Sequence, residues 1–323
     1  MVQPLLSVRN LVTRFRTSRG TITAVNNVSF DVAAGETVAI VGESGSGKSV
    51  TALSLLRLIP DPPGHIESGE IFFDGKDLLK MSDAEIRAVR GNRIAMIFQE
   101  PMSTLNPSLT VGMQVGEPIN LHRKAPWRLA IDKARDLLDL VQMSDTASRV
   151  TAYPHQFSGG MRQRAMIAMA LACEPQLIIA DEPTTALDVT VQAQILDLLK
   201  DLADRNGSAL LLITHDLGVV ARYADRVVVM YAGRVVESAP AAELYARPRH
   251  PYTRGLMASV PRLDGDTRLR LVPIEGQPPD LASIPNGCAF APRCRQAIEA
   301  CLNAPPALRN IDEGHHVACI LDT

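Results

Sequence analysis

The sequence predicts an α/β fold, and three observations support this. Short apolar runs rich in Val and Ile recur at "TVAIV", "IAMIF", "LIIAD", "ALLLIT" and "RVVVMY", and most are separated by segments of helical period. These runs are apolar nearly throughout, which is typical of strands in a mainly parallel sheet that is buried on both faces. The chain has 323 residues, 46% of them hydrophobic, which is enough to bury a large core.

Taken in order, the elements divide the chain into three parts. Residues 5–15 and 23–32 alternate apolar and polar side chains, which predicts an antiparallel β portion beside the main sheet. Residues 104–172 lack strand signals, and "WRLAIDKARDLLDLVQM" and "GGMRQRAMIAMALA" have helical spacing, which predicts a helical insertion. After about residue 238 Pro becomes frequent, indicating a loop-rich extension rather than a continued sheet. We therefore expect a domain over 1–240, with its helical part over 104–172, and an extension over 241–323.

Composition narrows the classes of partner. The net charge is -2, the pI is about 6.4, and Lys and Arg form no long run, so nucleic acid is not expected as the main partner. The first residues, "MVQPLLSVRN", do not have the pattern of a signal peptide, and we expect a cytoplasmic location. The longest apolar runs are shorter than the ~20 residues that span a bilayer, so any link to a membrane is expected through a partner.

One glycine-rich stretch predicts a phosphate-binding loop. "GESGSGKS", residues 42–49, matches G-x-x-x-x-G-K-[ST] and lies between an apolar strand and the helical segment "VTALSLLRL". Its glycines allow backbone N–H groups to surround phosphate oxygens, Lys48 is expected to reach the β- and γ-phosphates, and Ser49 to bind Mg²⁺. The nucleotide-contacting set is Gly42, Glu43, Ser44, Gly45, Ser46, Gly47, Lys48 and Ser49.

Two adjacent carboxylates end the apolar run "LIIAD". Successive side chains of a strand point in different directions, so Asp181 and Glu182 suit two different tasks. We expect Asp181 to hold Mg²⁺ and Glu182 to orient or deprotonate the attacking water. Without a phosphate loop in the same chain, solvated turn residues would be an equally good interpretation.

The motifs "GESGSGKS", "FSGGMRQR", "LIIADEP", "TALD" and "ITHD", in this order, resemble those of ATP-binding cassette ATPases. The resemblance implies a RecA-like P-loop core, a helical subdomain and a head-to-tail dimer with ATP between one subunit's phosphate loop and the other's signature motif. It also implies that Ser158, Gly159 and Gly160 contact the γ-phosphate of the partner's ATP. The ends of this motif, Phe157 and Met161, depart from the commonest form.

Four further residues take roles from the resemblance. Gln99 matches the loop that senses Mg²⁺ and the attacking water, and His215 matches the switch histidine that bonds the γ-phosphate and helps to hold Glu182. Asp188 matches the loop that communicates across the dimer, although its local sequence also suits a helix N-cap. Phe15 is the candidate for stacking on adenine, with a place in the core as its alternative.

Two longer stretches, "FQEPMSTLNP" and "RHPYTRGLMASVP", resemble the ATPase subunits of oligopeptide, dipeptide and nickel importers. This implies ATP-driven import through two membrane permease subunits at the cytoplasmic face of the membrane, with an extracytoplasmic substrate-binding protein and a second, related but different ATPase chain. Homodimerisation, and nickel or another solute as the cargo, are the alternatives. A soluble cassette ATPase is less favoured because neither a long coiled coil nor a second cassette is visible.

Four cysteines lie in the extension, at Cys288, Cys294, Cys301 and Cys319. Their spacing is not the C-x2-C of structural zinc sites, and four thiolates also suit an iron–sulfur cluster. The tail "CAFAPRC" resembles that of the peptide importers, which implies a [4Fe–4S] cluster in some members. Zinc, or thiols that only pack, are the alternatives, and Cys173 is expected to be a core residue.

Overall fold

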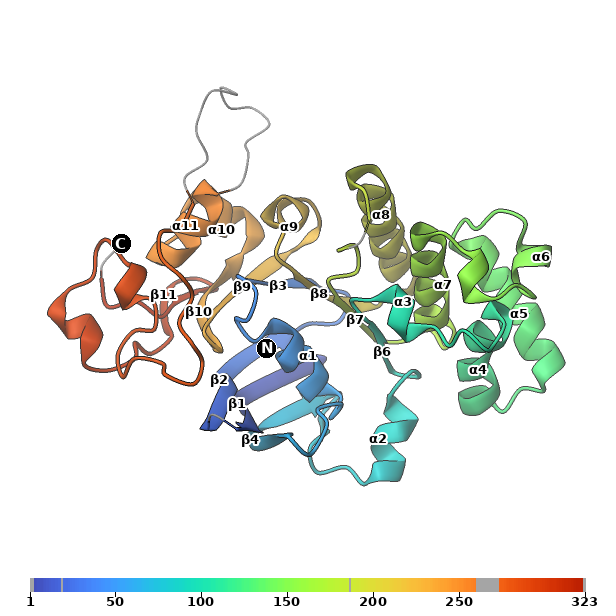
Figure 1. Ribbon diagram of the computed structural model, residues 1–323, viewed down its shortest axis with the longest axis horizontal. Helices are drawn as coiled ribbons and strands as arrows, with labels where there is room; N and C mark the ends of the chain where they lie inside the picture. The colour runs from blue at the N-terminus through green and yellow to red at the C-terminus, as the bar shows by residue number, and fades with distance from the viewer. Residues whose placement is uncertain (1–2, 19, 186, 260–272, 322–323) are drawn as a thin grey trace. The chain divides into compact units, whose positions relative to one another are not determined.

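The structure is a computed structural model that describes residues 3–18, 20–185, 187–259 and 273–321 (Figure 1). Its internal contacts divide the chain into two compact units. The first unit contains Met1–Val32, Thr37–Leu79 and Ile213–Thr323, and the second contains Ala33–Glu36 and Lys80–Leu212.

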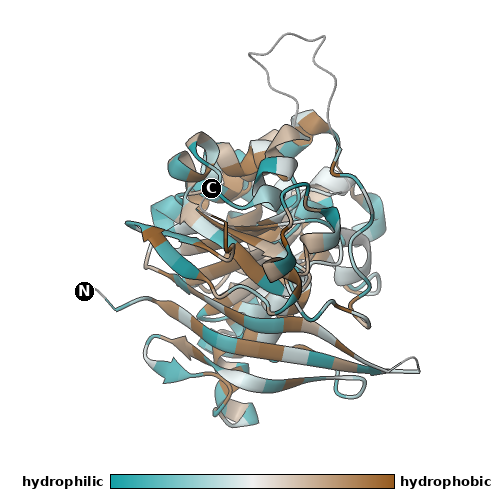
Figure 2. Ribbon diagram, turned by 90° about the vertical axis from the view of Figure 1, so that its left-hand side faces the viewer, coloured by the Kyte–Doolittle hydropathy of each residue, from teal (hydrophilic) through white to brown (hydrophobic). Residues whose placement is uncertain are grey.

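An antiparallel sheet begins the first unit. Its strands run in the order β2-β1-β4-β5, and their bounds are β1 Leu6–Thr17, β2 Gly20–Val32, β4 Gly64–Phe73 and β5 Lys76–Asp77. The predicted antiparallel pair is confirmed, since Leu6 lies opposite Val32 and Phe15 opposite Ile22. Figure 2 shows hydrophobic and hydrophilic bands alternating along the strand that leaves the N-terminus, as expected for a sheet with one buried face.

The main strands of the first unit run in the order β11-β12-β10-β9-β3. Strand β3 (Thr37–Val41) is fully buried and runs parallel to β9 (Arg226–Tyr231), whereas β10 (Arg234–Pro240) is antiparallel to β9. The extension adds β11 (Arg309–Asp312) and β12 (His315–Val317), with β12 antiparallel to β10. The expectation that the extension would not continue a sheet is therefore wrong. These strands have four and three residues, too few to show a periodic pattern.

Short helices cover these strands. They are α1 Lys48–Leu55, α9 Leu217–Tyr223, α10 Ala241–Ala246, α11 Pro251–Ala258 and the 3-10 turns Ala291–Arg293 and Glu299–Leu302. Tyr252 and Phe290 of the extension belong to the same buried cluster as Val41 and Val229 of the parallel strands. The extension therefore shares the hydrophobic core of the first unit.

The second unit is mainly helical. Strand β6 (Ile94–Ile97) runs parallel to β7 (Leu177–Asp181), and β8 (Ala209–Thr214), whose first four residues belong to this unit, lies beside β7. The helices are α2 Asp83–Val89, α3 Pro101–Thr104, α4 Val111–Arg123, α5 Trp127–Leu140, α6 Thr146–Arg149, the 3-10 turn Pro154–Gln156, α7 Gly159–Leu171 and α8 Val189–Asn206. Residues 104–172 contain helices and no strand, and Figure 1 shows them in green.

The predicted α/β class is confirmed by this alternation of buried strands and helices. None of the helices in the described ranges combines the length and the apolar composition that crossing a bilayer requires.

Candidate nucleotide site

The predicted phosphate loop, residues 42–49, directly follows β3 in the first unit, and its last two residues, Lys48 and Ser49, begin α1. Two positions of the loop require glycine, because the backbone of neighbouring strands leaves no room for a Cβ atom. A Cβ on Gly42 would lie 2.2 Å from the carbonyl oxygen of Met230, and a Cβ on Gly47 would lie 2.4 Å from that of Ala24. Gly47 also has a φ of 101°, which favours glycine, and it begins α1. The loop therefore lies directly against the backbone of neighbouring strands, and it ends in the first turn of α1.

Lys48 is buried within this loop. Its Nζ donates to the carbonyl oxygens of Gly42 at 2.8 Å and Glu43 at 3.0 Å. Beside it, the hydroxyl of Ser46 is buried, and no hydrogen-bond partner for it is found in the described part of the chain. A buried cation, an unsatisfied hydroxyl and the N-terminus of α1 together suit an anionic phosphate group.

The predicted carboxylates follow β7 in the second unit. Asp181 is the last residue of the strand and is buried, while Glu182 is partly exposed with a left-handed φ of 45°. Glu182 Oε2 accepts hydrogen bonds from Gln99 Nε2 at 3.0 Å and from Thr185 Oγ1 at 2.8 Å. The structure thus brings together Gln99 and Glu182, which are 83 positions apart in the sequence. The strained backbone at Glu182 has no sequence signal, and such strain is common at active sites.

The predicted signature residues start α7. Ser158 Oγ accepts a hydrogen bond from the N–H of Met161, and a Cβ on Gly160 would lie 3.1 Å from Val191 Cγ1. The N–H of Val191 in turn donates to Asp188 Oδ1 at 3.0 Å, so Asp188 is the N-cap of α8. The starts of α7 and α8 therefore lie against each other, which places Asp188 near the signature residues.

Two other predicted residues, Phe15 and His215, belong to the first unit. Phe15 is half-buried in β1 and packs on Gly64 of β4, where an added Cβ would lie 2.6 Å from its ring. His215 follows β8 and is exposed. It belongs to the first unit, whereas Glu182 belongs to the second.

Sequence reasoning missed two contacts between the extension and the phosphate loop. Tyr252 Oη accepts a hydrogen bond from the N–H of Glu43 at 2.8 Å. Arg293 Nη1 and Nη2 donate to the two carboxylate oxygens of Glu43 at 2.6 and 3.0 Å. The Glu43 carboxylate raises the pKa of Arg293, and burial raises the pKa of Tyr252, which keeps the latter a neutral hydroxyl. No sequence pattern relates residues so far apart.

The four cysteines of the extension line one small cavity together with Phe290, and none of them forms a disulfide. Burial raises the pKa of Cys288, with a further contribution from the nearby Cys301 and Cys319. No group of three or more His, Cys, Asp or Glu side chains in the described ranges is placed to hold a metal ion. The thiols are thus gathered but not arranged as ligands. Cys173 is buried, as expected for a core residue.

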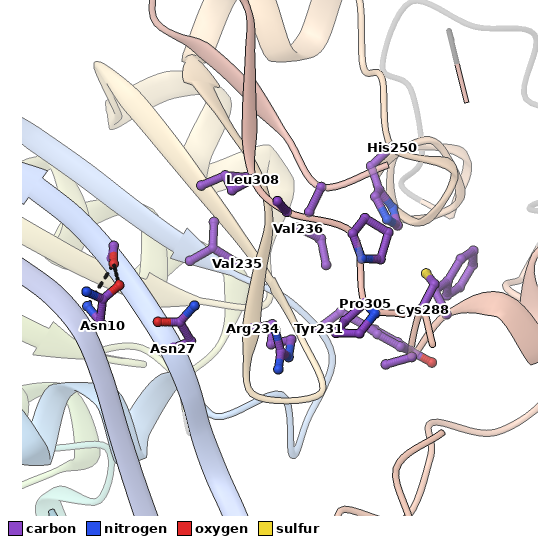
Figure 3. Close-up of a pocket in the computed structure, with 16 residues that line it drawn as sticks. Asn10, Asn27, Tyr231, Arg234, Val235, Val236, His250, Cys288, Pro305 and Leu308 are labelled. Atoms are coloured by element: carbon purple, nitrogen blue, oxygen red, sulfur yellow. Dashed lines mark hydrogen bonds between the residues drawn. The ribbon is translucent and has the colours of Figure 1, made fainter. Parts of the chain in front are cut away.

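A larger cavity of about 490 Å³ lies next to this one (Figure 3). Asn10 and Asn27 lie at one end of the view, and His250 and Cys288 lie at the other. Cys288, His250 and Phe290 line both cavities, so the cysteine cavity borders the larger one. The larger cavity is lined by no residue of the phosphate loop.

Comparisons with known proteins agree with this geometry. The family model "ABC transporter" matches residues 25–185, and "Oligopeptide/dipeptide transporter, C-terminal region" matches residues 236–301. The chain is 51% identical to the dipeptide transport ATP-binding protein DppD of Bacillus subtilis, over 99% of this chain and 95% of that protein. It is also 51% identical to the oligopeptide transport ATP-binding protein OppD of Haemophilus influenzae, over 94% of this chain and 93% of that protein.

Solved structures give the same result. An ATP-binding cassette in a dimeric post-hydrolysis state with bound ADP and Pi is 28% identical with a TM-score of 0.66, covering 73% of this chain and 98% of that one. A component of an ABC transporter complex from Clostridium perfringens is 28% identical with a TM-score of 0.63, covering 76% of this chain and 92% of that one.

Proposed function

Since the chain belongs to the ATP-binding proteins of ABC-type oligopeptide and dipeptide transporters, we propose that it hydrolyses ATP to power peptide import through partner membrane subunits. The observation that carries the proposal is the phosphate loop between β3 and α1, with Lys48 buried inside it. The names of relatives about half identical over nearly the whole chain support peptides as the cargo. Nickel or another small solute is the alternative cargo.

In the first unit, the phosphate loop is proposed to bind the phosphates of ATP. Lys48 would exchange its bonds to the Gly42 and Glu43 carbonyls for bonds to phosphate oxygens. Ser49, Asp181 and Gln99 are proposed as the residues that would hold Mg²⁺, which would neutralise phosphate charge. Phe15 is proposed to stack on adenine.

Glu182 is proposed to orient and deprotonate the attacking water. Its carboxylate accepts hydrogen bonds from Gln99 and Thr185 at Oε2, and these bonds would hold it in place to accept the proton. Gln99 then serves as a positioning residue for this carboxylate. His215 is proposed to bond the γ-phosphate and to help hold Glu182.

A complete site is proposed to need a second ATPase subunit. Ser158, Gly159 and Gly160 start α7, where backbone N–H groups would bind the phosphate of an ATP held by the partner. Asp188 caps α8, whose Val191 lies against Gly160, and is proposed to relay changes across the dimer. We propose a related but different chain as this partner, with a second copy of this chain as the alternative. Two permease subunits would hold the pair at the cytoplasmic face of the membrane, and an extracytoplasmic binding protein would deliver the peptide.

Two variants test the ATPase assignment. Lys48→Ala should abolish ATP binding, because the buried cation of the loop is lost. Glu182→Gln should keep ATP binding and lower kcat by about 10²–10⁴-fold, the usual contribution of a general base. Glu117→Gln, an exposed carboxylate on α4, is the matched control and should keep both. Full hydrolysis by Glu182→Gln would contradict the assigned role.

The cargo is tested in proteoliposomes that contain the membrane subunits. A binding protein loaded with di- or oligopeptide should stimulate ATP hydrolysis several-fold, and a nickel-loaded one should not. If only the nickel-loaded binding protein stimulates hydrolysis, the cargo is nickel and not a peptide. Mass determination of the purified complex separates the heterodimer from the homodimer.

We further propose that Cys288, Cys294, Cys301 and Cys319 hold a [4Fe–4S] cluster, with zinc as the alternative. Their gathering around one cavity and their all-thiolate chemistry support this, although the thiols must move to reach ligand geometry. Anaerobically purified protein should contain about four irons and four acid-labile sulfides per chain. Cys294→Ser should lower this content. If the protein contains zinc instead of iron, the site has no redox-active group. If it contains no metal, the four thiols only pack and the cluster proposal is wrong.

A further inference from the structure

One residue of the phosphate loop, Glu43, is bound by the extension through both its carboxylate and its backbone N–H. Glu43 follows Gly42 directly, and its carboxylate receives a two-pronged bond from Arg293, 250 positions away. Such paired N–H···O bonds between a guanidinium and a carboxylate fix geometry as well as charge. The side chain of Arg293 is only 4% exposed and that of Glu43 is 26% exposed, so water screens the pair less than a fully exposed ion pair.

Arg293 is itself held rigidly. Its Nε donates to the carbonyl of Glu275 at 3.0 Å, and Nη1 also reaches Tyr231 Oη at 3.3 Å. Its guanidinium carbon lies 5.9 Å from the ring centroids of both Tyr231 and Phe290, within the range of a cation–π contact. Tyr231 ends β9, so the position of Arg293 is set by a strand of the core.

The extension also holds the backbone of Glu43. The Tyr252 hydroxyl that accepts from the Glu43 N–H belongs to a ring packed 4.5 Å from that of Tyr231. The Glu43 carbonyl in turn accepts from Lys48. The amide, the carbonyl and the carboxylate of Glu43 are thus all engaged, and the position of this residue affects where the Lys48 ammonium lies.

We propose that Arg293 is a positioning residue for the ATP site, which clamps Glu43 so that the loop and Lys48 are preorganised for phosphate. This inference rests on the assignment of residues 42–49 as the ATP-binding loop. Arg293 touches no reacting atom. Its loss should therefore weaken ATP binding and leave the hydrolysis step nearly intact.

The experiment measures ATP binding and steady-state hydrolysis on the full chain, reconstituted with its partner subunits for hydrolysis. Arg293→Gln should raise the Kd and KM for ATP about ten-fold or more, because Glu43 loses the paired bonds that hold it, with kcat within about two-fold of wild type. Arg295→Gln is the matched control, since Arg295 lies in the same segment and pairs with Glu275 at 2.7 Å but is 74% exposed. It should bind ATP like the wild type.

A double-mutant cycle isolates the pair. Glu43→Gln should also raise the KM, and combining it with Arg293→Gln should add little, because both changes remove one interaction. Fully additive effects would overturn the proposal. So would an Arg293→Gln protein that binds ATP as tightly as the Arg295→Gln control.

Folding and site assignment are separated by two further proteins. If Arg293→Gln does not fold, Arg293→Lys, which keeps the charge but cannot form the paired bond, should fold and show an intermediate KM; a wild-type KM would overturn the proposal. Lys48→Ala reports on the site itself. If ATP binding survives in Lys48→Ala, the loop assignment fails. If it is lost there and unchanged in both Arg293 variants, only the role of Arg293 fails.

Discussion

Glu237 of β10 and His315 of β12 form a buried pair, with 2.8 Å between Glu237 Oε1 and His315 Nε2 and both side chains completely buried. Glu237 also accepts hydrogen bonds from the backbone N–H groups of Arg249 and His250. One carboxylate thus joins a core strand to two separate parts of the extension. This explains how a segment with few long apolar runs stays attached to the first unit.

Removing the histidine should therefore destabilise the first unit. His315→Ala leaves Glu237 buried with only its backbone donors, and we expect the free energy of unfolding to fall by about 3 kcal/mol. Urea unfolding followed by circular dichroism measures this. His316→Ala, a partly exposed neighbour, should change stability by less than about 0.5 kcal/mol. Equal effects of the two variants would contradict the importance of the buried pair.

Stability should fall in mild acid because of His250. Burial lowers the pKa of this side chain to about 4 in the folded protein, whereas in the unfolded chain it is near 6.5. Between these pH values the unfolded chain is therefore protonated at His250 and the folded protein is not. The stability of the fold with a neutral His250 is fully present above about pH 6.5, and part of it is lost as the pH falls toward 4. Between pH 7 and pH 5 the loss of unfolding free energy amounts to about 2 kcal/mol.

The measurement compares unfolding free energies at pH 7 and pH 5 for wild type and His250→Asn. Asparagine keeps an acceptor for the N–H of Tyr252, which His250 Nδ1 binds at 3.0 Å, but it does not titrate. The variant should lose less stability on acidification by the amount given above. An unchanged pH dependence would show that other groups control it.

Gly47 should not tolerate a methyl group. In Gly47→Ala the new Cβ would meet the Ala24 carbonyl, and we expect ATP binding to be lost as the loop shifts. Gly35→Ala is the control, because Gly35 also has a positive φ but its added Cβ would meet no atom within 4 Å. The control should cost only the backbone strain of about 1–2 kcal/mol. Calorimetric titration with ATP distinguishes the two.

Asp188 allows its structural role to be separated from its proposed functional one. Asp188→Ala removes the N-cap of α8 and should lower stability by about 1 kcal/mol, while Asp188→Asn keeps the cap and should not. If Asp188 also communicates across the dimer, both variants should hydrolyse ATP more slowly. If only Asp188→Ala hydrolyses ATP more slowly, in line with its lower stability, Asp188 acts only as a helix cap.

Local patterns predicted much of the fold. Strands such as β3 and β7 are continuous apolar runs, and residues 42–49 are contiguous, so the chain shows them without reference to distant parts. Strands β11 and β12 were missed, because strands of four and three residues are too short to show a periodic pattern. Glu182 has a positive φ that its residue type does not indicate, because only the turn around it imposes that conformation.

The sequence alone determined the α/β class, the phosphate loop and the motifs that place the chain among cassette ATPases, because each depends on neighbouring residues. Only the tertiary structure decided that Arg293 holds Glu43, that His315 holds Glu237 and that Gln99 meets Glu182. Each of these pairs forms because separate strands and turns pack together within one unit. The spacing of these residues along the chain does not predict their contacts, because the contacts depend on how the elements pack.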